Sequence, residues 1–133
     1  MSIVLDARLD PILVWRFSGA PRDQDLADFT GEHDRRLDAG TPFLSVIDAR
    51  AAELLTFEQA RRQAEWRATR GDELRALSLG LALVLPSESL RRALSCMTTW
   101  RRVPGPRVLC PHMAAAMLWA EGQLLRNLVR SAA

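Results

Sequence analysis

The chain has 133 residues, of which 48% are hydrophobic and 26% charged, with a formal net charge of +2. This length and composition are typical of one soluble globular domain, and they exclude a disordered tail, a collagen-like fibre and a disulfide-stapled miniprotein. All 18 basic residues are arginine; acids outnumber arginines in residues 1–60, and arginines outnumber acids in residues 61–133. Such an asymmetry permits a polar charge distribution that steers a partner.

The termini and the cysteines predict a cytoplasmic protein. The N-terminus lacks the basic segment and the long apolar core of a signal peptide. The longest apolar run, Leu79–Leu85, is far shorter than the ~20 residues that a membrane span needs. Cys96 and Cys110 have no metal-binding spacing and are interpreted as buried, reduced thiols, with a disulfide between them as the less favoured alternative.

The N-terminal third of the chain predicts a β-hairpin followed by a helix. Two β-rich runs, Ser2–Ala7 and Ile12–Phe17, flank a turn at Asp10-Pro11, and so short a connection favours antiparallel pairing. The next segment, residues 23–38, has apolar residues at helical spacing and acids over the rest of its helical wheel. It is therefore predicted to form an acidic helix.

The remainder of the chain alternates strands with helices. Two near-continuous apolar runs, Phe43–Asp48 and Leu79–Leu85, are typical of central strands covered on both faces. Between them, Thr56-Phe57-Glu58-Gln59 has the pattern of a capping box, which opens a helix through about Thr69. The remaining predicted elements are a third helix capped by Ser87, a short strand over Arg107–Cys110 and a last helix that begins at Pro111.

The predicted order of elements is β-β-α-β-α-β-α-β-α, with no linker or repeat to divide it. Because helices that connect buried strands cover those strands, this order predicts one α/β domain over residues 1–133. We expect a single mixed, mostly parallel sheet of about five strands with about four helices.

The order of the elements resembles the STAS-like fold of anti-sigma-factor antagonists and their wider SpoIIAA-like relatives. The segments that carry the resemblance are Phe17-Ser18-Gly19 before the acidic helix, Val46-Ile47-Asp48 at the end of a strand, the loop 49–55 before the helix at Thr56, and Ala115-Ala116-Met117-Leu118-Trp119. The resemblance implies a regulatory domain. Phosphorylated members carry Asp-Ser-Ser-Gly where this chain has Thr56-Phe57-Glu58-Gln59, so we expect the serine-phosphorylation switch to be lost.

Three residues are candidates for binding a ligand or anchoring a loop. Asp48 ends a central strand, at the sheet edge where ligands gather in open α/β folds, and is interpreted either as a ligand-orienting carboxylate or as a loop anchor bonded to backbone amides. Thr56 is interpreted as an N-cap rather than a phosphorylation site. Glu58 is either a fixed negative charge or an ordinary acid of the first helical turn. The two histidines have no metal-ligand spacing, and we expect no metal, no cofactor and no catalysis.

Arginines and tryptophans on the second and third predicted helices favour an interaction surface, because tryptophan flanked by arginine is a common interface anchor. The candidate residues are Trp66, Arg70, Arg91, Arg92, Trp100, Arg101 and Arg102. Nucleic acid is disfavoured as a partner because the basic excess is small. We expect a non-enzymatic module that binds an acidic-surfaced protein, or a second copy as a homodimer, through helix faces. The alternative is a domain that binds a small apolar ligand or a lipid in a cavity near Asp48.

Overall fold

The sheet begins with the predicted hairpin. In the computed structural model, which describes residues 2–132, β1 (Ser2–Leu9) pairs antiparallel with β2 (Ile12–Gly19). Three further strands then add in chain order, each parallel to the one before: β3 (Phe43–Ala52), β4 (Ser78–Val84) and β5 (Arg107–Cys110). The strand order is therefore β1-β2-β3-β4-β5, and it confirms the predicted mixed, mostly parallel sheet.

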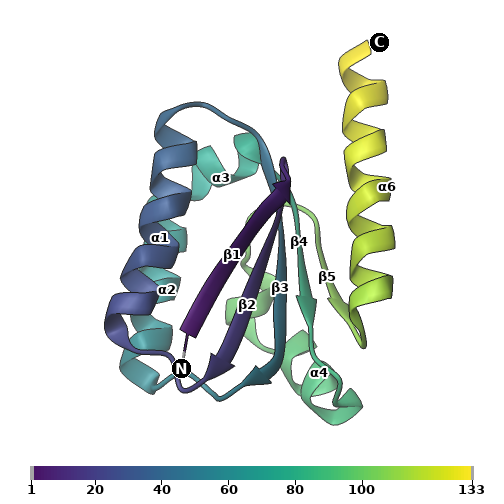
Figure 1. Ribbon diagram of the computed structural model, residues 1–133. Helices are drawn as coiled ribbons and strands as arrows, with labels where there is room; N and C mark the ends of the chain where they lie inside the picture. Colours follow the sequence, from purple (N-terminus) through teal and green to yellow (C-terminus); the bar gives the residue numbers. More distant parts are fainter. Residues whose placement is uncertain (1, 133) are drawn as a thin grey trace.

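Helices cover both faces of this sheet. The described residues form α1 (Asp23–Asp38), α2 (Phe57–Thr69), α3 (Gly71–Leu77), α4 (Glu88–Ser95), α5 (Thr98–Arg101) and α6 (Met113–Ala132). Figure 1 shows α1, α2 and α3 on one side of the sheet and α6 on the other. No helix within residues 2–132 is long and apolar enough to cross a membrane.

The alternation of side chains along β2 divides the core into two layers. Leu13 and Trp15 are buried together with Leu37 of α1 and Leu74 of α3. The other face of the sheet buries Ile12 and Val14 beneath Ala116 and Ala120 of α6. The neighbouring β3 and β4 residues in this layer are Leu44, Val46, Ala82 and Val84. Because successive strand residues point to opposite faces, one strand contributes to both layers.

A close approach between β4 and α6 fixes the position of that helix. A Cβ atom added at Gly80 would lie 2.7 Å from Cη2 of Trp119 and 3.0 Å from Cζ3. Those distances are too short for non-bonded carbon atoms, so the indole ring occupies the space that any other side chain at Gly80 would need. Glycine at this strand position therefore lets α6 pack directly on the sheet.

Three predictions about local structure need correction. Two short helices, α3 and α5, raise the number of helices within residues 2–132 to six, against about four predicted. Such short helices contain too few turns for a periodic apolar pattern to be recognised. β3 continues past Asp48 into the predicted loop because Ala51 and Ala52 pair with Ser18 and Gly19 of β2. Both cysteines are free, as predicted, but only Cys110 is buried, whereas Cys96 is exposed.

Candidate functional site

Two of the predicted interaction residues, Trp66 and Arg70, hold α2 against α1. The Trp66 indole Nε1 donates a hydrogen bond to Oδ1 of Asp34 at 2.9 Å. Arg70 donates to Asp34 at 2.9 Å and to Asp38 at 2.8 Å, and its side chain is only 16% exposed. These contacts place both side chains inside the contact between the helices instead of on a free surface.

The other predicted interaction residues lie on α4, on α5 and at the residue after it, and none of them is on α2. Arg91 turns back and donates to the carbonyl oxygens of Leu85 and Pro86, at 2.6 and 2.8 Å. Arg92 is exposed and pairs with Glu88 one turn earlier. Trp100 is half-buried, and Arg101 and Arg102 are exposed. The seven predicted residues are thus divided between two places.

Asp48 is anchored by its neighbour Arg50. The carboxylate accepts from the Arg50 backbone N–H at 3.2 Å and from the guanidinium at 2.8 Å, and these hydrogen bonds hold the pKa of Asp48 below its ordinary value. Asp48 borders an open depression together with Arg16 and Arg50, on the face of the sheet that carries α6. The carboxylate accepts from one backbone amide, as the loop-anchor interpretation expects, but that amide belongs to Arg50 of β3 and not to a loop.

The capping box at the start of α2 forms as predicted. The Gln59 backbone N–H donates to Oγ1 of Thr56 at 3.1 Å, and the Thr56 N–H donates to Oε1 of Gln59 at 3.0 Å. Thr56 is therefore an N-cap. Glu58 is exposed and pairs with Arg61 and Arg62 of the following turn, and the hydrogen bond from Arg61 lowers the pKa of Glu58. These contacts are those of an ordinary first-turn acid.

The outer face of α6 carries a stripe of exposed apolar side chains. Leu118 is 71% exposed, Leu125 62%, Leu128 56% and Val129 69%. Leu118, Leu125 and Val129 lie on the side of the helix opposite Ala116 and Ala120, which are fully buried against the sheet, and Leu128 lies at the edge of that side. Periodicity alone could not find this outer stripe, because α6 has apolar residues on both of its faces.

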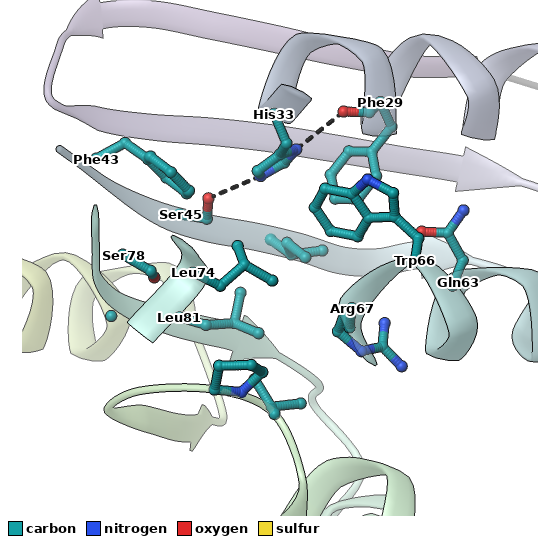
Figure 2. Close-up of a pocket in the computed structure, with 14 residues that line it drawn as sticks. Phe29, His33, Phe43, Ser45, Gln63, Trp66, Arg67, Leu74, Ser78 and Leu81 are labelled. Atoms are coloured by element: carbon teal, nitrogen blue, oxygen red, sulfur yellow. Dashed lines mark hydrogen bonds between the residues drawn. The ribbon is translucent and has the colours of Figure 1, made fainter. Parts of the chain in front are cut away.

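A small cavity of about 90 Å³ lies over β3 and β4 on the face that carries α1, α2 and α3. Figure 2 shows His33 and Phe29 of α1, Ser45 of β3 and Trp66 and Arg67 of α2 arranged around it. The cavity is therefore on the opposite face of the sheet from Asp48. Arg67 could not be predicted as a lining residue, because one arginine among the 18 in the chain has no distinguishing local pattern.

His33 forms part of this wall in its neutral state. Nδ1 lies 2.9 Å from the Phe29 carbonyl oxygen, and Nε2 lies 3.3 Å from Oγ of Ser45. Because a carbonyl oxygen only accepts hydrogen bonds, Nδ1 carries the proton and Nε2 accepts from the serine hydroxyl. Burial lowers the pKa of His33 and keeps the imidazole uncharged.

Comparison with known proteins shows the fold. No protein-family model matches the chain, and no curated protein matches it. Among solved structures, the chain is similar to an uncharacterized protein of the DUF3478 family with a SpoIIAA-like fold from Shewanella loihica PV-4. The two share 18% sequence identity with a TM-score of 0.68, over 90% of this chain and 92% of that one. The predicted SpoIIAA-like fold is thus confirmed.

Proposed function

We propose that this protein is a non-enzymatic cytoplasmic module that acts by binding, and that its binding surface is the outer face of α6. The observation that carries the proposal is the stripe of Leu118, Leu125, Leu128 and Val129, four large apolar side chains each more than half exposed on one helix face. Large contiguous apolar patches are uncommon on monomeric soluble proteins and often mark interaction sites. The partner that fits this face best is a second copy of the same helix.

The spacing along the stripe is that of a helix pairing with a helix. Leu118, Leu125 and Val129 of the stripe, together with Gly122 between them, follow one another at steps of four, three and four residues, which are the d and a positions of a heptad. Leu128 lies beside them at a g position. Figure 1 shows that the C-terminal end of α6 extends beyond the sheet, where a neighbouring helix can approach it. A second α6 can therefore lie alongside without displacing the sheet.

Charge supports a parallel orientation for the two helices. In this register Glu121 takes a g position and Arg126 the e position that follows, and in parallel pairs these positions form salt bridges between helices. Both side chains are exposed, and neither makes an ion pair within residues 2–132. In the dimer, Glu121 of each copy would form a salt bridge with Arg126 of the other, so that both charges are paired. In an antiparallel pair Glu121 would face the apolar Leu128 instead.

The expected association is weak. Covering four half-exposed side chains on each of two copies gains on the order of 1 kcal/mol per side chain, or about 8 kcal/mol in all. Association itself costs about 4–15 kcal/mol in lost freedom of motion. The two terms are similar in size, so we expect a dimer that dissociates on dilution from millimolar to micromolar protein.

Sedimentation equilibrium over that concentration range tests the proposal. The wild-type average mass should rise with concentration towards that of a dimer, and Leu125→Glu should keep the protein monomeric. Leu54→Glu is the matched control, because Leu54 is 87% exposed but lies in the loop before α2. A wild-type protein that stays monomeric throughout, or a dimer that survives Leu125→Glu, would refute the proposed surface. Binding of an acidic protein by Arg92, Arg101 and Arg102 stays a separate prediction.

A further inference from the structure

The cavity over β3 and β4 has mostly apolar walls. Its apolar lining includes Phe29, Phe43, Ile47, Trp66 and Leu74. Small-molecule sites have this character, with apolar and aromatic walls and a few placed polar groups. The two wall residues His33 and Ser45 bond to each other. The polar side chains that remain for a ligand are Gln63 and Arg67 of α2 and Ser78 of β4.

Arg67 is the unusual member of this lining. Its side chain is half-buried, and it makes no hydrogen bond or ion pair with any residue from 2 to 132. The other half-buried arginines in this range, including Arg36, Arg70 and Arg91, bond to carboxylates or to backbone carbonyls. Burial lowers the pKa of Arg67 from its ordinary value, and no neighbouring acid offsets this. The Arg67 nitrogens keep some contact with solvent, and a bound anion would replace that water with a charge-assisted hydrogen bond in a partly desolvated site.

Gln63 provides a second donor beside Arg67. It lies four residues earlier on α2, so both side chains lie on the same face of the helix. Gln63 is only 8% exposed, and its side-chain amide makes no hydrogen bond within the described part of the chain. Figure 2 shows both residues extending from α2 beside Trp66. The two parallel N–H donors of the Arg67 guanidinium match the two oxygens of one carboxylate, and Gln63 adds a polar group on the adjacent turn.

We propose that this cavity binds a small monocarboxylate with a short apolar body, whose carboxylate pairs with the Arg67 guanidinium on the side that Gln63 lines and whose body packs against the aromatic walls. The site is independent of the α6 surface. The volume of about 90 Å³ corresponds to roughly six water-sized places at ~15 Å³ each, and so to a short branched acid. It is too small to enclose the acyl chain of a lipid. A phosphate dianion would need more donors than the one arginine, one amide and one hydroxyl present.

Nuclear magnetic resonance titration of the full chain tests this site with three probes: isobutyrate, the neutral and nearly isosteric isobutyramide, and inorganic phosphate. We expect saturable shifts of the Trp66 indole and Gln63 side-chain amide signals with isobutyrate in the millimolar range. A charged hydrogen bond contributes enough that Arg67→Met should weaken isobutyrate binding roughly 10- to 100-fold. Arg61→Met is the matched control on α2, because Arg61 is exposed and paired with Glu58 and Glu65, and it should bind isobutyrate like the wild type.

The thermal stability of an Arg67 variant shows whether this arginine binds a ligand or stabilises the fold. Because Arg67 has no partner within residues 2–132, Arg67→Met should leave the thermal unfolding midpoint unchanged or raise it while binding is lost. A lowered midpoint would assign Arg67 a structural role and overturn the proposal. Gln63→Leu is a second variant, and it should also weaken isobutyrate binding. Absence of saturable shifts, equal affinity for isobutyramide, or tighter binding of phosphate would each overturn the proposed ligand class.

Discussion

The contact between Gly80 and Trp119 gives the sharpest prediction about stability. Gly80→Ala places a methyl group where the indole of α6 now lies, 2.7 Å from Cη2. Either the ring or the helix must move, and overpacking of this kind typically costs about 1–3 kcal/mol. We therefore expect the free energy of unfolding, measured by urea denaturation, to fall by roughly that amount.

Gly31→Ala is the matched control for this substitution. Gly31 lies within α1, and a Cβ added there meets nothing within 4 Å. Replacing a helical glycine in open space should stabilise the protein by roughly 0.5–1 kcal/mol. The two alanine substitutions are therefore expected to have opposite signs.

A double-mutant cycle then isolates the steric contact. In a Trp119→Leu background the Cη2 and Cζ3 atoms are gone, so Gly80→Ala should cost less than it does in the wild type. The Trp119→Leu background should restore only part of the free energy of unfolding that Gly80→Ala removes. The reason is that φ of Gly80 is +157°, a value that residues with a side chain rarely adopt. If Gly80→Ala costs the same in both backgrounds, the clash with Trp119 is not its cause.

Three further predictions concern α1, α2 and the cavity wall. Because burial lowers the pKa of His33 below its ordinary 6.5, the unfolded chain takes up this proton more readily than the folded one. The stability that His33 contributes is then present above about pH 6.5 and lost as pH falls below it. His33→Asn should therefore flatten this part of the urea-denaturation pH profile, and an unchanged profile would contradict the assignment. Thr56→Ala removes the N-cap of α2 and should cost about 1 kcal/mol by urea denaturation, whereas Thr69→Ala at the end of α2 should cost less. Asp34→Ala should lower the thermal midpoint more than Asp38→Ala, because Asp34 accepts from both Trp66 and Arg70 whereas Asp38 accepts from Arg70 alone; equal shifts would contradict this ranking.

Features set by local sequence could be predicted well. The capping box needs only Thr56 and Gln59 at the right spacing, and it forms with the expected hydrogen bonds. The apolar runs that became β3 and β4 are long enough to identify as central strands without knowing their neighbours. The order of these elements was enough to indicate the SpoIIAA-like fold.

Features that depend on which residues meet in space could not be predicted. The opposite net charges of the two halves suggested charged surfaces, but folding brings acidic α1 against α2, where Asp34 pairs with Arg70. Arg67 and Arg70 are three residues apart, and only the packed structure shows that Arg70 has carboxylate partners while Arg67 faces a cavity. In the same way, only the position of α6 on the sheet reveals that Leu125 points outward.

Covalent trapping of two copies tests the central claim, pairing through α6, most directly. In a Cys96→Ser background, Val129→Cys places a thiol on the outer stripe, at a position where two parallel helices bring equivalent residues within disulfide distance, about 4.4–6.8 Å between Cα atoms. We predict that mild oxidation converts this variant to a disulfide-linked dimer much faster than it does Leu54→Cys in the same background. Equal rates for the two variants would contradict the account.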